Sequence, residues 1–178
     1  MLSDITLVTQ VAVFGNKKAF DQLVRKYQSP VRRFLLNLTL GDSQLSDDLA
    51  QDTFIKAYSN IAQFRGLSSF QAWLFRIAYN VFYDYTRKHR MTEDIDTAMT
   101  KSQVVTKNNN GLKADVYQAL SILKKEERTC ITLQLIDGYS IDEIAGITGM
   151  PKGTVKSHLS RGKEKMANYL KHNGYDGQ

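Results

Sequence analysis

The chain has very little cysteine and very little proline. Cys130 is the only cysteine among 178 residues, so no disulfide can form within the chain and a cysteine-rich zinc site is excluded. Cys130 stands inside an apolar helical pattern, which is typical of a buried core thiol. The sequence has only two prolines and few stretches in which apolar and polar residues alternate. This composition favours α-helices over β-strands.

The usual signs of a membrane protein or an enzyme are also missing. No apolar run approaches the roughly 20 residues that a membrane span needs, and Met1–Thr6 lacks the basic and apolar segments of a signal peptide. We therefore expect a cytoplasmic protein. His89, His158 and His172 lack the spacing of metal ligands, and no glycine-rich phosphate loop occurs. The sequence thus predicts a protein that is not an enzyme and binds no metal or cofactor.

Helical patterns divide the chain into two parts. Residues 1–90 and 114–178 show apolar residues at helical spacing, whereas residues 91–113 are mostly polar and include an asparagine-rich stretch. We expect an all-α fold in which two small helical domains, 1–90 and 114–178, are joined by a flexible linker at 91–113.

Capping and breaking residues predict the first helix boundaries. A short helix should cover Ser3–Val13 and end at Gly15. Pro30 either kinks the second helix or opens a new one. Ser46 can cap the next helix, because the aspartates that follow it would lie in the first turn, where the helix dipole favours anions.

A long helix over 70–90 is predicted to carry aromatic residues on two faces. Ser68 and Gln71 fit a capping box at its start. An ordinary core stripe consists of Phe70, Trp73, Leu74, Ile77, Ala78 and Val81. The opposite face carries Phe75, Tyr79, Phe82 and Tyr83. This second face either packs on a neighbouring helix or another protein, or stacks on unpaired bases.

Residues 140–159 have the features of a helix-turn-helix. Ser140 and Glu143 fit a capping box, and small Ala145 would let a second helix pass close by. Gly149 stands where the tight turn requires a positive φ, and Pro151 suits the start of the next helix. The segment therefore predicts DNA binding, in preference to an ordinary helical hairpin.

The second helix of this motif is predicted to separate an apolar stripe from a polar face. At about 100° per residue, the inward stripe contains Val155, Leu159, Gly162 and Met166. The polar face contains Lys156, Ser157, Ser160, Arg161 and Lys163, which are donors suited to phosphates and base edges.

Charge is concentrated on the same segment. Residues 151–172 contain six Lys or Arg and one Glu, a net charge of +5, whereas residues 114–150 contain three Lys or Arg and six Asp or Glu, a net charge of −3. The C-terminal domain is therefore polarised, with its positive end on the helix that would read DNA. Residues 1–90 have a net charge of +5 from twelve basic and seven acidic residues, which favours nucleic acid slightly.

Three stretches together resemble the extracytoplasmic-function (ECF) group of bacterial sigma factors. They are Asp47–Tyr58 (DDLAQDTFIKAY), Phe64–Asn80 (FRGLSSFQAWLFRIAYN) and Gly153–Arg161 (GTVKSHLSR). The resemblance covers residues 17–170. It implies a transcription initiation factor that brings core RNA polymerase to a promoter, with no chemistry of its own. It also implies contacts with the β′ clamp helices and the β flap, and control by an anti-sigma factor.

The same resemblance implies three sets of site residues. Core polymerase would be bound through Asp47, Asp48, Gln51, Asp52 and Phe54. The −10 element would be read as it melts, with a flipped-out base held by the loop 64–69 and Asn80, through Phe64, Arg65, Ser68, Arg76, Tyr79, Asn80, Tyr83, Arg87, Lys88 and Arg90. The −35 duplex would be read in its major groove by Lys152, Thr154, Lys156, Ser157, His158, Ser160, Arg161 and Lys163.

Two other classes compete with this interpretation. A stand-alone helix-turn-helix regulator would dimerise and bind a palindrome without polymerase, and the aromatic, basic helix over 70–90 argues against a simple dimerisation domain. An adaptor protein would use its N-terminal aromatic residues to bind another protein. Duplex binding measured with and without core polymerase separates the three.

Overall fold

The computed structural model describes residues 2–93 and 111–175, and these residues form helices and connecting loops without any strand. Contacts divide the chain into two compact units, one formed by 1–35 with 44–101 and the other by 36–43 with 102–178. The all-α prediction with two helical domains is confirmed. The boundaries predicted for the domains stay a prediction, and residues 94–110 of the expected linker lie outside the described residues.

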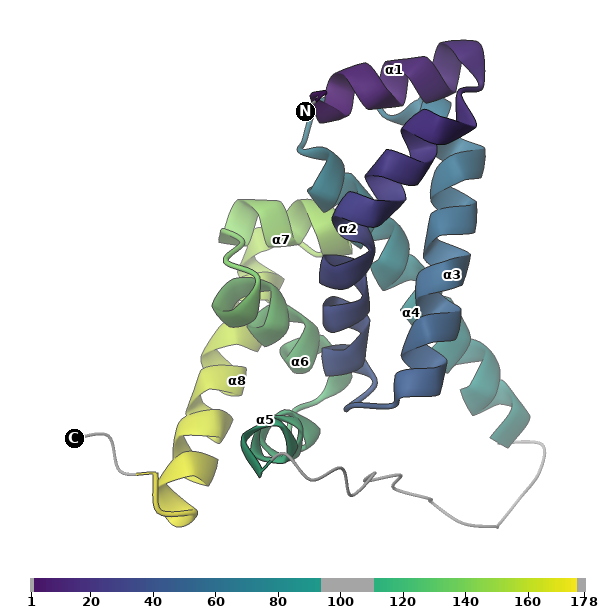
Figure 1. Cartoon of the computed structure of the whole chain (residues 1–178). Helices are drawn as coiled ribbons and strands as arrows, with labels where there is room; N and C mark the ends of the chain where they lie inside the picture. Colours follow the sequence, from purple (N-terminus) through teal and green to yellow (C-terminus); the bar gives the residue numbers. More distant parts are fainter. Residues whose placement is uncertain (1, 94–110, 176–178) are drawn as a thin grey trace. The chain divides into compact units, whose positions relative to one another are not determined.

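The N-terminal helices are α1 (Asp4–Phe14), α2 (Lys17–Leu38), α3 (Ser43–Asn60), the 3-10 turn η1 (Ile61–Gln63) and α4 (Phe70–Glu93). Figure 1 shows α2, α3 and α4 running alongside one another, with α1 lying across one end. Helix α1 packs against η1. Its position is also held by Asp4, which accepts hydrogen bonds from Lys26 Nζ at 2.7 Å and from Tyr27 Oη at 2.5 Å.

The first helix, Asp4–Phe14, lies within one residue of its predicted bounds and ends at Gly15 as predicted. The Ser3 hydroxyl accepts a hydrogen bond from Thr6 N at 3.3 Å, and Gly15 ends α1 in the left-handed conformation with φ of 62°. Pro30 does not open a new helix, because it lies inside the continuous α2. It lacks an N–H to donate to the carbonyl one turn earlier, so α2 tolerates one missing hydrogen bond there.

Two predicted caps are wrong by a few residues. Helix α3 begins at Ser43 and not at Ser46, whose side chain is fully buried inside it. Ser69, and not Ser68, caps α4, since its Oγ accepts a hydrogen bond from Ala72 N at 3.1 Å. Ser68 with Gln71 satisfies the capping-box pattern, but the backbone geometry of the loop places Ser69 at the cap position.

Helix α4 is buried on both of its aromatic faces. Phe75 is fully buried and stacks on Phe34 of α2, with ring centroids 4.9 Å apart and planes 16° apart. Tyr79 and Phe82 are buried as well, whereas Trp73 and Ile77, which we expected in the core, are only half-buried. For Phe75 the packing interpretation of the second face is therefore correct.

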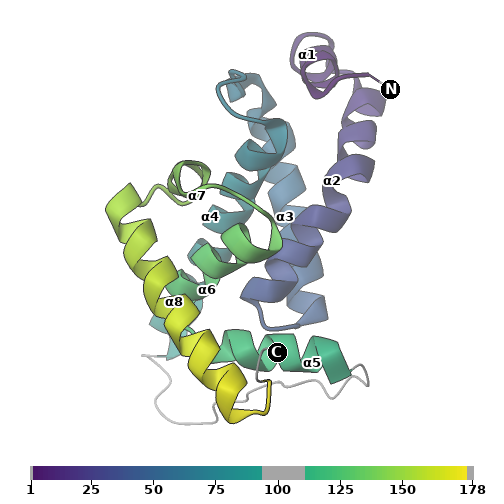
Figure 2. The same cartoon turned by 90° about the vertical axis from the view of Figure 1, so that its left-hand side faces the viewer.

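The C-terminal unit contains α5 (Gly111–Ser121), α6 (Lys125–Ile131), the π-helical turn η2 (Thr132–Ile136), α7 (Ile141–Thr148) and α8 (Lys152–His172). Helix α8 packs on α5, α6 and α7 (Figure 2). The core is filled by side chains from every helix of the unit: Leu120, Ile131, Leu133, Ile144, Ile147, Val155 and Leu159. Cys130 is buried there as predicted, and burial raises the pKa of its thiol to about 11.

The ends of the expected linker are helical where the structure describes them. Helix α4 continues to Glu93 and α5 begins at Gly111, so both helices extend into the range 91–113. No described helix is long and apolar enough to cross a membrane.

Candidate nucleic-acid interface

The helix-turn-helix forms as the sequence predicted. Ser140 Oγ accepts a hydrogen bond from Glu143 N at 3.3 Å, and the Glu143 carboxylate accepts one from Ser140 N at 2.8 Å, which completes the capping box. Gly149 ends α7 with φ of 74°, and α8 begins directly after Pro151. The turn therefore fixes the direction of α8 relative to α7.

Helix α8 separates buried from exposed side chains along its length. Val155, Leu159 and Gly162 are buried against the rest of the unit, whereas Met166 is half-buried. The polar residues of the opposite face are all exposed: Lys156, Ser157, Ser160, Arg161 and Lys163. A basic, donor-rich face two turns long is thus free to enter a groove of duplex DNA.

The remaining residues predicted to read the −35 duplex have different surroundings. Thr154 is exposed, and Lys152 is exposed but paired with Asp142 of α7, with Nζ and Oδ1 2.9 Å apart. His158 is half-buried, and its Nδ1 is buried without a hydrogen-bond partner in the described part of the chain. Nδ1 of His158 is therefore shielded from a base or a phosphate.

Two contacts hold α8 firmly on α6. A Cβ atom at Gly162 would lie 2.7 Å from Ile131 Cγ1, so only glycine permits this close approach. Glu127 Oε2 accepts hydrogen bonds from Lys165 Nζ at 2.7 Å and from Lys124 N at 3.1 Å. Burial acts to raise the pKa of Glu127, but the bonds from Lys165 and Lys124 outweigh it and lower the pKa below its usual value.

A second polar site is a cleft of about 260 Å³ between α3, η1 and α4. Trp73 and Ile77 supply an apolar wall, and both are half-buried. The other lining residues are polar or basic: Lys56, Asn60, Gln63, Arg76 and Asn80. The cleft therefore combines a surface for stacking a flat ring with amides for its edge and cations for a phosphate.

Hydrogen bonds order one wall of this cleft and leave the other wall open. Asn60 Nδ2 donates to Lys56 O at 2.8 Å, and Gln63 Nε2 donates to Asn60 Oδ1 at 3.0 Å. Asn80 is exposed, and its amide has no hydrogen-bond partner among the residues that the structure describes. Asn80 can therefore offer both a donor and an acceptor to a ligand.

The loop between η1 and α4 is anchored at its first residue. The Phe64 ring packs edge-on against Phe70 and also contacts Trp73, with centroids 5.5 and 5.6 Å apart. Arg65 and Ser68, both predicted to read the −10 element, are exposed on the loop. The anchored ring therefore fixes the start of the loop beside the tryptophan that forms the cleft wall.

Further along α4, the residues predicted for the −10 element are exposed to different degrees. Tyr79 is only 8% exposed and its ring lies 4.2 Å, between centroids, from that of half-buried Tyr83. Arg87, Lys88 and Arg90 are exposed. Tyr79 thus offers little ring surface to a base, whereas the basic end of α4 is accessible.

A third feature is an apolar groove of about 410 Å³ between α2 and α3. It is lined by Phe20, Val24, Gln51, Phe54, Ile55, Tyr58 and Ser59. Gln51 and Phe54 were predicted to bind core polymerase, and the other predicted residues, Asp47, Asp48 and Asp52, are exposed on the same helix. Asp47 pairs with Arg32 of α2, with Oδ1 and Nε 2.5 Å apart.

Comparison with known proteins decides the family. Residues 23–92 match the model of sigma-70 region 2, and residues 113–166 match that of sigma-70 region 4. The chain is 34% identical to the ECF RNA polymerase sigma-E factor of Haemophilus influenzae, over 95% of this chain and 96% of that protein. The chain belongs to the ECF group of the sigma-70 family.

Two further sigma factors agree with this assignment. The RNA polymerase sigma-H factor of Pseudomonas aeruginosa is 32% identical, over 84% of this chain and 85% of that protein. Among solved structures, the sigma factor RpoE of Bartonella quintana, crystallised with the anti-sigma factor NepR, gives a TM-score of 0.74 at 32% identity. That match covers 86% of this chain and 98% of the other.

The sequence of this sigma factor did not lead us to several residues of the cleft and the groove. Lys56, Asn60 and Gln63 were missed because a polar residue on a helix is usually only solvated. The groove had a visible signal. Its α3 residues lie at i, i+3, i+4, i+7 and i+8 from Gln51, and this stripe is distinct from the buried stripe of Leu49, Thr53 and Ala57.

Proposed function

We propose that this sigma factor binds core RNA polymerase through the α2–α3 groove, reads −35 duplex DNA with α8, and captures an unpaired base of the −10 element in the cleft. The observation that carries the proposal is the division of α8, whose apolar stripe is buried while its basic face is exposed behind a capped turn. The factor supplies recognition, and polymerase supplies the chemistry, in the cytoplasm where polymerase acts.

The exposed face of α8 suits the major groove. A helix fits that groove and presents its N-terminal residues to base edges, while lysines nearby neutralise phosphates. Arg161 is the residue best suited to a guanine, because its guanidinium can donate two parallel hydrogen bonds. Lys152, Thr154, Lys156 and Lys163 would fix the position of the helix on the duplex.

The cleft beside α4 suits one unpaired base. A duplex hides the edges of its bases, so only a base taken out of the stack can reach Asn80. Trp73 would stack on the base, and Arg76 would hold an adjacent phosphate. Phe64, Arg65 and Ser68 would close the cleft from the loop, and Tyr83, Arg87, Lys88 and Arg90 would follow the strand along α4.

The α2–α3 groove suits a helix of another protein. Its lining is apolar, and the exposed acids at 47, 48 and 52 lie on the same helix, so a partner with apolar and basic side chains would match it. We assign it to the β′ clamp helices, and assign the β flap to the C-terminal unit. We further propose that an anti-sigma factor silences the protein by covering these surfaces, since the similar sigma factor RpoE of Bartonella quintana was crystallised with the anti-sigma factor NepR.

Transcription in vitro tests the proposal directly. Core polymerase is given genomic fragments of the host with and without this protein, and start sites are mapped by sequencing the transcripts. New specific start sites that need the protein support a sigma factor. Sequence-specific duplex binding without new transcripts would instead indicate a stand-alone helix-turn-helix regulator.

A matched pair of variants tests the role of α8 in a duplex-binding measurement. Arg161→Ala should weaken binding to the −35 duplex by about 1–3 kcal/mol. The loss of affinity should be larger for the −35 sequence of the promoters found by transcription than for scrambled DNA. Lys171→Ala, an exposed position in the last turn of the same helix, should change both affinities little. If Arg161→Ala loses the same affinity for both DNAs, Arg161 contacts only phosphates and reads no base.

A further inference from the structure

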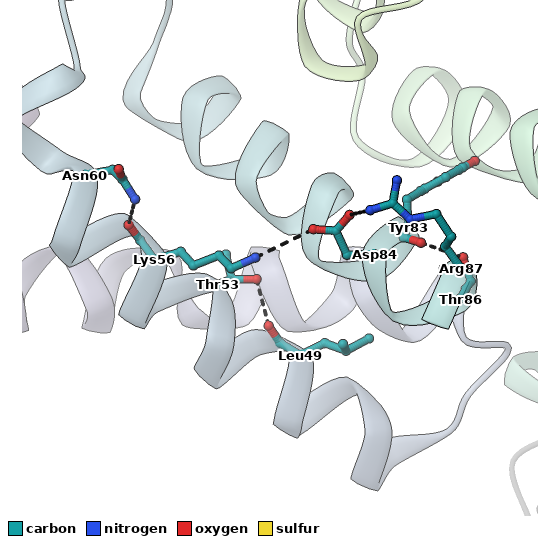
Figure 3. Close-up of polar contacts among 8 residues, drawn as sticks. All are labelled: Leu49, Thr53, Lys56, Asn60, Tyr83, Asp84, Thr86 and Arg87. Atoms are coloured by element: carbon teal, nitrogen blue, oxygen red, sulfur yellow. Dashed lines mark hydrogen bonds and ion pairs between the residues drawn. The ribbon is translucent and has the colours of Figure 1, made fainter. Parts of the chain in front are cut away.

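Asp84 of α4 bridges two basic side chains from two helices (Figure 3). Its Oδ1 lies 3.0 Å from Arg87 Nη2 of the same helix, and its Oδ2 lies 3.8 Å from Lys56 Nζ of α3. Lys56 lines the cleft, and Arg87 belongs to the basic end of α4. One carboxylate thus connects the cleft with the surface that continues from it.

The stability of the fold does not explain why a carboxylate stands at position 84. The side chains of Lys56, Asp84 and Arg87 are 52%, 45% and 73% exposed, and ion pairs at such exposure contribute little to stability. Asp84 is also the only acid among residues 70–90, whose exposed basic residues Arg76, Arg87, Lys88 and Arg90 make the surface of α4 positive. An acid at this position reduces the attraction of that surface for any DNA strand.

Asp84 lies beside the path that a captured strand would take from Asn80. Asn80, Asp84 and Arg87 follow one another at i, i+4 and i+7, so they lie on one face of α4. A strand whose base enters the cleft at Asn80 would run along this face. The two cations held by Asp84 therefore lie beside the path that its phosphates would take.

We propose that Asp84 is a positioning residue that acts through Lys56 and Arg87 and makes capture of the −10 strand selective. This inference rests on the proposed function of the cleft. A lysine or arginine side chain that moves freely can contact the phosphates of any strand. A side chain that is already held in place loses less conformational entropy on binding, but it contacts the phosphates only of a strand in the right register. Asp84 lowers affinity for all strands and raises discrimination among them.

The experiment uses full-length protein bound to core polymerase. The probe is a set of duplex DNAs that contain an unpaired segment of randomised sequence, and bound molecules are separated and sequenced. For Asp84→Asn we expect more total DNA to be retained at low salt, because a negative charge is removed. The enrichment of the best unpaired sequences over the average should fall about two- to tenfold, as expected when one restrained side chain is released.

Asp21→Asn is the matched control. Asp21 is exposed on α2 and lines neither the cleft nor the groove, so the same change of charge there should leave the enrichment unchanged. Lys56→Met should also reduce enrichment, and the double variant Lys56→Met with Asp84→Asn should lose less than the sum of the two single losses. This shortfall shows that Asp84 acts through Lys56. Additive losses would contradict it.

Two outcomes would count against these claims. If Asp84→Asn binds every sequence more tightly by one common factor, its enrichment equals that of the unaltered protein; Asp84 is then only a general repulsive charge, and the inference is wrong. If the unaltered protein itself shows no preference among unpaired segments, the proposed base capture fails, and the failure lies in the proposed function.

Discussion

Asn80 is a single side chain whose surroundings indicate a direct contact with DNA. It is exposed at the cleft, and its amide has no partner within the described residues. Asn80→Ala removes one donor and one acceptor without disturbing the core, so promoter melting should weaken by about 1–3 kcal/mol while binding to core polymerase is kept. Permanganate reactivity of unpaired thymines measures the melting, and co-purification measures core binding.

Tyr79→Ala is a poor substitute for that experiment. The ring is only 8% exposed, so its removal would leave a cavity and destabilise the unit in addition to any effect on DNA. Asn80→Asp is the better companion variant, since it keeps the shape but replaces a donor by a charge that repels phosphate. Normal open complexes with Asn80→Ala would contradict base capture at this residue.

Glu127 predicts a pH dependence for the C-terminal unit. Because its pKa is lowered in the folded chain, it contributes stability above its ordinary pKa of about 4.5, and that stability is lost as the pH falls through the lower folded value. Glu127→Gln should reduce the free energy of unfolding near pH 7 by about 1–3 kcal/mol. The difference between variant and unaltered protein should shrink at acidic pH.

Chemical denaturation at a series of pH values measures this effect. Glu164→Gln is the matched control, because Glu164 is exposed on α8 beside Lys165 and has no partner among the described residues. It should change stability little at any pH. A loss for Glu127→Gln that is the same at neutral and acidic pH would show that packing, and not the charge, is responsible.

At the scale of elements, the docking of α8 depends on Gly162. An added methyl group would lie 2.7 Å from Ile131 Cγ1, so Gly162→Ala should cost about 1–3 kcal/mol through overpacking, even though alanine favours a helix. Ile131→Ala alone leaves a cavity, but it also removes the atom that would collide. The double variant should therefore be more stable than the sum of the single effects predicts, and denaturation of the four proteins measures this coupling.

The contrast between α8 and α4 shows what the sequence could and could not reveal. In α8 a single apolar stripe faces a small unit, so helical spacing predicted the burial of Val155, Leu159 and Gly162. Helix α4 has aromatic residues all around, and spacing cannot tell which of them meets a neighbour. Only the approach of Phe34 from α2 shows that Phe75 is core and leaves Trp73 at the cleft.

The face of α8 and the cleft beside α4 also differ in how far the sequence predicts them. The positive face of α8 lies on one helix and follows from one stretch of sequence. The cleft joins Lys56 and Asn60 of α3 with Trp73 and Asn80 of α4, and no local pattern brings two helices together. The resemblance to ECF sigma factors pointed to Asn80, but the residues opposite it required the packing of the two helices.

At the scale of the whole molecule, the two units should unfold separately. Each has its own core, with Phe34 and Phe75 in the first and Ile144 and Val155 in the second. Trp73 is the only tryptophan, so its fluorescence reports the first unit alone, whereas far-ultraviolet circular dichroism reports both. Independent units should give two midpoints that respond to different substitutions.

Two core variants test this independence. Ile144→Ala should destabilise the second unit by about 2–5 kcal/mol, which lowers the midpoint of part of the dichroism change and leaves the Trp73 midpoint in place. Phe34→Leu should lower the Trp73 midpoint by a loss of about 1–3 kcal/mol and leave the other transition unchanged. If both midpoints move together in each variant, the chain folds as one cooperative body. A sigma factor of that kind could not adjust its −10 and −35 contacts separately, because strain at one DNA element would be transmitted to the other.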